Sequence, residues 1–348
     1  MTERAPDETA QTTTHRALLG DARDLPLADE SVELVVTSPP YPMIEMWDET
    51  FTSLDAAIGD ALAAGDGATA YDLMHGTLAA VWEEVERVLV PGGVAAINVG
   101  DATRTVDGNF QLYPNHATVL STLQDVGLTP LPDVLWRKPA NSAAKFMGSG
   151  TSPPNAYVTL EHEYVLLARK GGLRRPDSDR RHRSSYFWEE RNRWFSDVWE
   201  VRGERQALDA GPRERTGAFP FEIPYRLINM YSVQGETVLD PFFGTGTTTL
   251  AAMASARSSV GVEVDRDLVE RFAPHEANVA SLANDRSRDR LAAHREFVAD
   301  RDDRPGYEAS HYDTRVVTKQ ERNIRLPTVE TVHGDDAGWR VGHGWLEG

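Results

Sequence analysis

The sequence contains no cysteine, and this absence removes several kinds of chemistry from consideration. Disulfide bonds, thiolate metal sites and cysteine nucleophiles are all excluded. No apolar run approaches the roughly 20 residues that span a bilayer, and the N-terminus lacks the apolar region of a signal peptide. We therefore expect a soluble, cytoplasmic protein without a membrane partner. Its 348 residues are enough for a full hydrophobic core in one large domain or two.

Residues 35–41 read Val-Val-Thr-Ser-Pro-Pro-Tyr, an apolar run that ends in a hydroxyl, two prolines and an aromatic ring. Proline fixes φ and lacks an N–H, so a strand should stop here in a stiff, extended loop. Open α/β sheets bind their ligands at such carboxyl ends of strands. The Ser38 hydroxyl and the Pro39 carbonyl can accept hydrogen bonds, and Tyr41 offers a flat face. These groups suit a planar base with an exocyclic amine; a structural turn is the alternative.

Residues 238–249 form a second motif, Val-Leu-Asp-Pro-Phe-Phe-Gly-Thr-Gly-Thr-Thr-Thr. An apolar strand that runs into a glycine turn and then a helix brings a ligand onto backbone N–H groups. No lysine follows the second glycine, which excludes a P-loop. Thr249 stands where the dinucleotide fingerprint needs its third glycine, which argues against an NAD-dependent oxidoreductase.

Together, the two motifs resemble the paired signatures of the S-adenosylmethionine-dependent DNA amino-methyltransferases. In that family a Ser-Pro-Pro-Tyr type of motif carries catalysis, and an Asp-Pro-Phe-x-Gly-x-Gly loop holds the cofactor. The catalytic motif comes first here, which resembles the circularly permuted β group that includes the cytosine-N4 enzymes. The resemblance covers roughly residues 15–270. It implies S-adenosylmethionine as the cofactor, double-stranded DNA as the partner, a flipped target base and no metal.

The resemblance also implies roles for individual residues. It assigns catalysis to the loop residues Ser38, Pro39, Pro40 and Tyr41. It assigns cofactor binding to residues in the motifs and near strand ends, namely Asp21, Thr37, Phe219, Asp240, Phe242, Gly244, Gly246, Thr247, Thr248 and Glu263. Among these, Glu263 lies about 20 residues past the glycines, where an acid grips ribose hydroxyls in dinucleotide-binding folds. For Asp21, a turn-forming role is the alternative.

The expected target is the N4 amine of cytosine, because serine before Pro-Pro is commoner in the family's cytosine-N4 enzymes. The missing cysteine excludes the covalent route of the cytosine-C5 enzymes. Two alternatives stay open: methylation of adenine N6, and binding of S-adenosylmethionine and DNA without catalysis. From the resemblance we also expect a short palindromic recognition sequence such as CTAG. A monomer and a homodimer are both compatible with the sequence.

The chain carries few lysines and a formal net charge of −18, which is unusual for a partner of nucleic acid. An acidic, lysine-poor surface resembles that of proteins from salt-loving organisms, in which salt screens the self-repulsion. An acidic protein from a mesophile with GC-rich codons is the alternative, and composition leaves both open.

Apolar periodicity predicts an α/β fold along most of the chain. We expect strands at 15–19, 32–36, 94–99, 130–136 and 161–168, and helices that include 73–89 and 115–126; residues 91–93 should end the first of these helices. An insertion at 43–67 should be helical and overhang the catalytic pocket, with Trp47 bordering the base; a core or lid role for Trp47 is the alternative. The expected architecture is a Rossmann-like, doubly wound, mostly parallel seven-stranded sheet, circularly permuted, with an inserted target-recognition region.

Residues 169–215 carry 13 Arg or Lys against nine Asp or Glu, a local +4 in a chain whose remainder sums to −22. Five arginines form an arginine-rich segment within residues 174–183: Arg174, Arg175, Arg180, Arg181 and Arg183. Aromatic residues follow it, and arginine interleaved with aromatics suits a DNA-reading surface. Its position between the two motifs resembles that of the family's target-recognition region. A solvated loop is the alternative.

The expected domain organisation follows the motifs. Residues 1–14 should be a disordered tail, 15–139 the catalytic half, and 140–218 the late sheet strand with the target-recognition region. Residues 219–300 should form the cofactor-binding half. Residues 301–348 form a C-terminal extension for which the sequence indicates no role.

Overall fold

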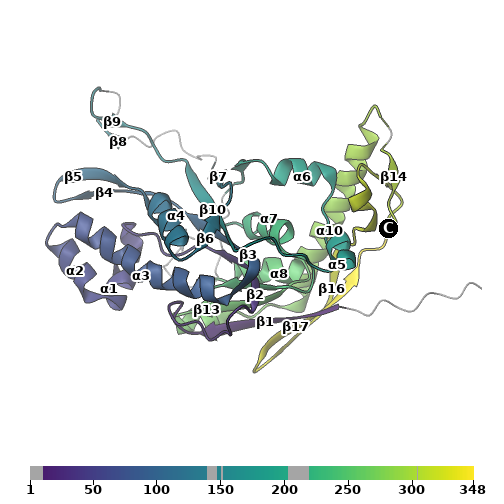
Figure 1. The fold of residues 1–348 in the computed structure, drawn as a ribbon, viewed down its shortest axis with the longest axis horizontal. Helices are drawn as coiled ribbons and strands as arrows, with labels where there is room; N and C mark the ends of the chain where they lie inside the picture. The colour runs from purple at the N-terminus through teal and green to yellow at the C-terminus, as the bar shows by residue number, and fades with distance from the viewer. Residues whose placement is uncertain (1–10, 139–146, 150–151, 203–218, 304) are drawn as a thin grey trace, which may run out of the picture.

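The computed structural model describes residues 11–138, 147–149, 152–202, 219–303 and 305–348, and it shows an α/β fold built on one large sheet (Figure 1). Eleven strands belong to this sheet in the described part of the chain. In order across it they are β11 (Val198–Glu200), β7 (Val134–Arg137), β10 (His162–Lys170), β3 (Leu89–Val99), β2 (Val32–Thr37), β12 (Thr237–Asp240), β13 (Ser258–Glu263), β1 (Gln11–Leu19), β17 (Gly338–Trp345) and β16 (Pro327–Asp335), while β6 (Leu128–Pro130) pairs with β10.

The centre of the sheet is parallel. Neighbouring strands β3, β2, β12, β13 and β1 all run in one direction. They therefore end together at one edge of the sheet, called here the carboxyl edge, and begin at the opposite amino edge. Strand β10 is antiparallel to β3 and so begins at the carboxyl edge. The run from β7 to β1 contains the seven expected strands, and β6, β11, β16 and β17 extend it.

Helices cover both faces of the sheet, because alternate residues of its strands point to opposite sides. Val35 joins a core cluster with the first group of helices, whereas Leu34 and Val36 join a second cluster on the other face. The first group comprises α1 (Asp48–Leu54), α2 (Ala56–Ala63), α3 (Gly67–Val88) and α4 (Asn115–Asp125). The second comprises α7 (Glu222–Tyr231), α8 (Thr247–Ala254) and α10 (Glu276–Ala299), while the short α9 (Arg266–Arg271) follows β13. This two-sided core confirms the doubly wound fold.

Several boundaries differ from the prediction. Residues 11–14, expected to be disordered, belong to β1, because β17 of the C-terminal extension pairs with them. Residues 91–93 do not end a helix: α3 stops at Val88, and β3 runs through them, with Gly92 at a φ of +82°. The strand expected at 130–136 is divided into β6 and β7.

Two hairpins extend from the carboxyl edge and lie at the left end of Figure 1. The first, β4 (Ala102–Val106) with β5 (Asn109–Tyr113), directly follows β3. The second, β8 (Met147–Gly148) with β9 (Ala156–Tyr157), lies between β7 and β10. Helix α5 (Ser178–Arg183) lies at the other end of the same view, while α6 (Trp188–Trp194) leads towards β11.

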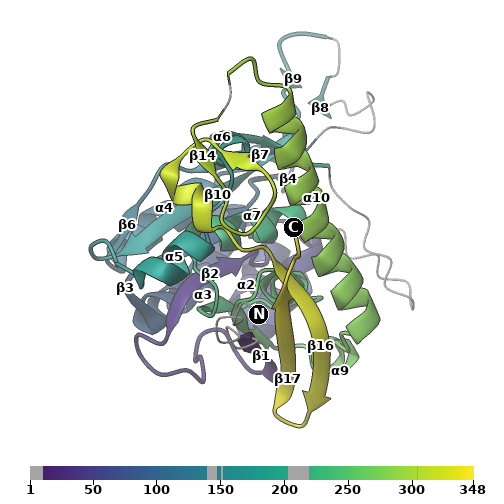
Figure 2. The ribbon, with the colours of Figure 1, turned by 90° about the vertical axis from the view of Figure 1, so that its right-hand side faces the viewer.

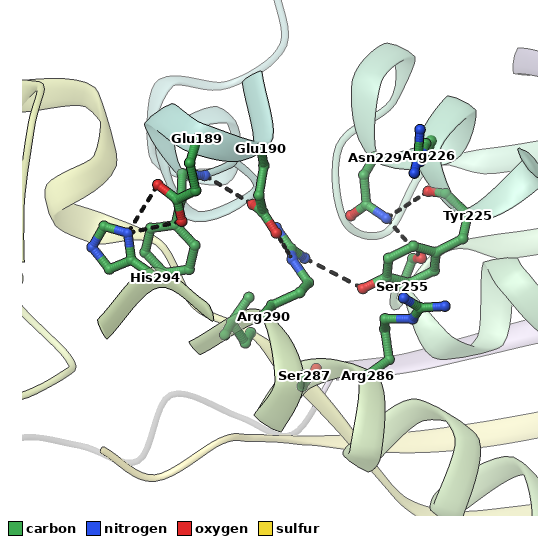
Figure 3. Close-up of polar contacts among 12 residues, drawn as sticks. Glu189, Glu190, Tyr225, Arg226, Asn229, Ser255, Arg286, Ser287, Arg290 and His294 are labelled. Atoms are coloured by element: carbon green, nitrogen blue, oxygen red, sulfur yellow. Dashed lines mark hydrogen bonds and ion pairs between the residues drawn. The ribbon is translucent and has the colours of Figure 1, made fainter. Parts of the chain in front are cut away.

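The C-terminal extension adds β16 and β17 to the sheet, and its Glu321 accepts the Trp188 N–H of α6 at 2.7 Å. It contains β14 (Tyr307–Glu308), β15 (Arg315–Val316) and the 3-10 helix η2 (Lys319–Asn323) before the β16–β17 hairpin (Figure 2). Figure 3 shows the contact between α6 and α10, in which Arg290 donates to the two carboxylate oxygens of Glu190 at 2.6 and 2.8 Å. Beside it, His294 bonds Glu189 at 3.0 Å. Burial opposes the charged form of His294, but bonding to the Glu189 carboxylate raises its pKa overall.

None of the helices in the described ranges is both long enough and apolar enough to cross a membrane.

Candidate active site

The Ser-Pro-Pro-Tyr loop lies at the carboxyl edge, directly after β2. Its strand is buried up to Thr37, and the chain then turns so that Ser38 and Pro40 line a cavity of about 270 Å³. The Ser38 hydroxyl lies 2.9 Å from the Tyr41 hydroxyl. The loop therefore lies where the sequence predicted it, at the end of a strand, and Ser38 is one of the residues that line the cavity.

Tyr41 is held by residues that sequence reasoning missed. Its hydroxyl donates to Glu163 at 3.0 Å, and the Asn98 amide donates to the Tyr41 hydroxyl and to Glu163 at 2.7 Å each. Lys138 forms an ion pair with the same carboxylate. Asn98 is the penultimate residue of the buried strand β3, and Glu163 is the second residue of β10. A polar residue near the end of an apolar strand was therefore the available signal.

The tyrosine ring itself is half-buried, while its hydroxyl is enclosed by this network. One ring edge lies against Gly100, where an added Cβ would come within 3.0 Å of it. Burial, together with the neighbouring Glu163 carboxylate, raises the pKa of Tyr41 well above its usual value. Tyr41 therefore stays protonated near neutrality and donates to Glu163.

Most of the residues predicted to bind a cofactor line the same cavity. Those on its wall are Asp21, Phe219, Asp240, Phe242, Gly244, Thr247 and Glu263. Thr37, Gly246 and Thr248 support the wall without lining it. The catalytic loop and the predicted cofactor residues, which lie some 200 positions apart in the chain, thus share one site.

Asp240 joins the catalytic loop to the glycine loop. One of its carboxylate oxygens accepts the Thr37 hydroxyl at 2.7 Å and the Phe242 N–H at 3.1 Å. Burial raises the pKa of Asp240 to about 6, although hydrogen bonds from Thr37 and Thr248 oppose the rise. Thr248 also donates to the Val36 carbonyl at 3.3 Å. Asp240 therefore orients both loops from within the protein as well as facing the cavity.

The two glycines of the loop have different tasks. Gly244 adopts a φ of +56° and its missing side chain leaves open space. Gly246 has a φ of +80°, and an added Cβ would overlap the rings of Phe272 and Phe243. Close approach of a ligand to the backbone therefore fits Gly244, whereas Gly246 is required by packing and by its left-handed backbone.

Two acids at strand ends complete the polar wall. Glu263 accepts the Gly244 N–H at 2.8 Å with one oxygen and the Asp265 N–H at 3.0 Å with the other. Asp21 binds the Arg23 guanidinium, and these hydrogen bonds lower the pKa of Asp21. Both carboxylates lie at the neighbouring carboxyl ends of β1 and β13. Each Glu263 oxygen accepts one of these bonds and can accept another, for example from a nucleoside hydroxyl. Both Asp21 oxygens already accept two bonds from Arg23.

The predicted insertion at 43–67 forms the roof of the cavity. It folds as the 3-10 helix η1 (Glu45–Trp47) followed by α1 and α2, so the helical prediction is confirmed. Trp47, Phe51 and Leu54 reach the cavity from this side, and Leu78 of α3 joins them. An apolar roof facing a polar wall suits a ligand that combines a flat ring with hydroxyl and amine groups.

The arginine-rich segment is not part of this site. Arg174 donates to Glu236 at 2.7 Å and to the Tyr231 carbonyl at 3.1 Å. Arg180 donates to the Gln234 carbonyl at 2.9 Å. Residues 231–236 directly precede β12, so these contacts lie at the amino edge, across the sheet from Ser38.

The remaining arginines of the segment lie beside them. Arg183 donates to the Gln234 side chain at 2.9 Å and lies over the Trp345 ring. Arg175 and Arg181 are exposed. DNA binding by these five arginines stays a prediction, and the structure does not bring them to the catalytic loop.

Among the described residues, no cluster of three or more His, Asp or Glu side chains is arranged so that it could hold a metal ion.

Comparisons with known proteins agree on one family. A family profile described as DNA methylase matches residues 32–273. The chain is 47% identical over 322 residues to the type II methyltransferase M.MthZI of Methanothermobacter thermautotrophicus, an alignment that covers 90% of each protein. It is 51% identical over 271 residues to the type II methyltransferase M.MjaI of Methanocaldococcus jannaschii, covering 74% of this chain and 89% of that one. Protein TTHA0409 of Thermus thermophilus, solved in complex with S-adenosyl-L-methionine, is 31% identical with a TM-score of 0.58, covering 76% of this chain and 93% of that one.

Proposed function

The chain belongs to the DNA methylase family, and from this premise we propose that it transfers a methyl group from S-adenosylmethionine to the exocyclic N4 amine of cytosine in duplex DNA. The observation that carries the proposal is the hydrogen bond between Thr37 and Asp240. It holds the catalytic loop and the cofactor loop on one cavity, so that the two substrates of a methyl transfer can meet. The family depends on S-adenosylmethionine, and the cavity wall fits that cofactor.

An exocyclic amine is a poor nucleophile because its lone pair is delocalised into the ring. In the proposed mechanism its N–H groups donate to the Ser38 hydroxyl and the Pro39 carbonyl. These acceptors favour a tetrahedral nitrogen and aim its lone pair across the cavity. When bound, the cofactor supplies an electrophilic methyl group on its sulfonium. Orientation and fixed dipoles then provide most of the acceleration.

The network behind Ser38 gives the mechanism a route for the proton that the amine must lose. After transfer the nitrogen is positively charged, and one N–H bond breaks as its proton passes to the Ser38 oxygen. Ser38 can release its own proton to the Tyr41 oxygen 2.9 Å away, and Tyr41 donates to the Glu163 carboxylate at 3.0 Å. The chain of hydrogen bonds therefore ends on a carboxylate. Asn98 and Lys138 hold that carboxylate in place.

The target base must leave the duplex to reach the recessed loop, so the proposed reaction includes base flipping. The half-buried ring of Tyr41 is proposed to support the flipped base with its accessible part. Cytosine N4 is preferred over adenine N6 because serine precedes the two prolines. A non-catalytic protein that binds DNA and S-adenosylmethionine is the remaining alternative, and the complete Ser38, Tyr41 and Asp240 set argues against it.

Mass spectrometry of nucleosides from treated DNA tests the proposal. Purified protein, S-adenosylmethionine and plasmid DNA should yield N4-methylcytosine. If N6-methyladenine formed instead, the target would be the adenine N6 amine. If no methylated nucleoside formed, the proposed catalysis would be overturned. Paired duplexes with and without CTAG test that palindrome, and the same assay across a salt series tests salt adaptation.

A further inference from the structure

The longest stretch of the chain without Asp or Glu is residues 134–160, the carboxylate-free segment. It carries Arg137, Lys138 and Lys145, a formal +3 in a chain of −18 with 54 acidic residues. The next longest such stretch, residues 241–262, forms the cofactor loop and the buried helix α8. By contrast, residues 152–158 of the carboxylate-free segment are all exposed. Burial therefore does not explain its lack of carboxylates.

The segment leaves and re-enters the sheet at the catalytic edge. It begins with β7, whose last residue, Arg137, pairs with His162 of β10, and it ends at Leu160, three positions before Glu163. Glu163 binds the Tyr41 hydroxyl, so the described ends of the segment lie close to the catalytic loop. Its β8–β9 hairpin extends beyond the sheet on the same side as β4–β5 (Figure 1).

The two hairpins are joined to each other and to the roof of the cavity. The rings of Phe110 and Tyr157 stack with their centroids 4.8 Å apart. Arg104 of β4 binds Asp48 of α1 through two hydrogen bonds of 2.8 and 2.7 Å. The hairpins are therefore held in a defined position relative to the roof of the cavity.

Carboxylates near the described ends of the segment are mostly neutralised. Arg137 lies 3.8 Å from Glu161 and 3.1 Å from Glu200, and Lys138 pairs with Glu163. An exception is Asp107, which is exposed in the turn of β4–β5. Phosphates repel carboxylates within the Debye length of about 10 Å at 0.1 M salt, so this side of the acidic molecule admits a duplex most easily.

Exposed apolar groups on the hairpins add a second reason. Tyr157 is 49% exposed, Val158 83% and Leu112 48%, and all three lie on the two hairpins or directly after them. Aromatic and apolar side chains with neutral polar neighbours contact sugars and base edges without needing a net positive charge.

We propose that the hairpin surface, made of residues 102–113 and the described residues of 147–160, receives the DNA duplex beside the target base. This inference rests on the proposed function, because it assumes a DNA substrate with a base in the Ser38 loop. The hairpin surface would contact a phosphate backbone and the adjoining groove. Because this surface carries few carboxylates, it can approach the phosphates although the protein as a whole is acidic.

Charge insertion tests the surface. Ser152→Glu with Asn155→Glu adds two carboxylates to the exposed β8–β9 hairpin, and Ser178→Glu with Gln320→Glu adds two at exposed positions of α5 and η2. At 0.1 M salt the hairpin pair should raise the Kd for a fluorescent duplex by roughly tenfold or more, since one repulsion at 4 Å in water is worth about fivefold. The control pair should change it less than twofold. Cofactor affinity and melting temperature should match wild type in both.

Equal DNA affinity of the hairpin pair and the control pair would overturn the inference. Tyr157→Ala is the second variant: it removes the stacked ring without changing charge and should weaken DNA binding at high salt as well as at low salt. Wild-type binding by Tyr157→Ala would also count against the surface. Nucleoside analysis of wild type reports separately on the proposed function, so a methylating enzyme with insensitive hairpins would fail this inference alone.

Discussion

The arginine-rich segment and the carboxylate-free segment lie at opposite edges of the same sheet, and they use charge in opposite ways. The first has many cations, but Arg174, Arg180 and Arg183 are bonded to residues 231–236 at the amino edge. The second has few cations and no carboxylates, and its strand β7 ends at the carboxyl edge, where it pairs with the start of β10. A count of arginines therefore measures charge and not its availability, because a guanidinium that already donates to an internal carboxylate or carbonyl is less available to a ligand.

We expect a change in the Ser-Pro-Pro-Tyr loop at the carboxyl edge to affect function and to leave stability unchanged. Ser38→Ala should show the largest effect, a fall in kcat of roughly ten- to a thousandfold, as expected for one catalytic hydrogen bond. The bond should strengthen as the amine nitrogen becomes tetrahedral, so the Kd values for DNA and cofactor should change little. Single-turnover kinetics on saturating duplex measures it. A wild-type rate would make the loop a structural turn.

At the amino edge the opposite pattern is expected. Arg174→Met leaves the Glu236 carboxylate buried without its guanidinium and should destabilise the fold by about 3 kcal/mol. The kcat and the salt dependence of DNA binding should stay at the wild-type level. Chemical denaturation measures the loss, with the exposed neighbour variant Arg175→Met as the matched control. A stable Arg174→Met with weaker DNA binding would reverse the roles of the two edges.

Asp240 provides a pH test at the carboxyl edge. Its pKa is raised to about 6 from 3.8, so the folded state binds a proton that the unfolded state has released. The resulting stability is fully present below pH 3.8 and is lost as the pH rises through about 6. Relative to wild type, Asp240→Asn should therefore become more stable by about 2 kcal/mol between these values. Parallel denaturation curves of the two proteins at about pH 4 and about pH 7 measure the difference; a constant gap would contradict it.

The smallest effect is expected for the exposed arginines. Every phosphate interaction that a variant removes should lower the slope of log Kd against log salt by about 0.9. Arg175 and Arg181 belong to the arginine-rich segment at the amino edge, away from the catalytic loop. We therefore expect the double variant Arg175→Gln with Arg181→Gln to keep the wild-type slope. Fluorescence titration over a series of salt concentrations measures it. A slope lower by the equivalent of one or two phosphates would establish the DNA role that the arginine pattern first indicated.

Local chemistry made much of the site predictable from the sequence. Two prolines after an apolar run end a strand wherever they occur, and residues 237–249 form a strand, a glycine turn and a helix from their own backbone preferences. These features depend on dihedral limits and apolar alternation, which act within a few residues. For this reason the parallel sheet was correctly predicted, and the Ser-Pro-Pro-Tyr loop follows a strand as expected. The roles assigned to the loop and to the cavity wall stay predictions.

Contacts between distant segments were decided by the tertiary structure alone. Glu163 reaches Tyr41 across 122 positions because β10 is antiparallel to β3, and nothing near Tyr41 in the sequence indicates that partner. Residues 11–14 form a strand only because β17 supplies the hydrogen bonds. Arg174, Arg180 and Arg183 donate to residues 231–236, which the fold brings beside them. Strand pairing sets which charges meet, and that pairing is a property of the whole sheet rather than of any segment.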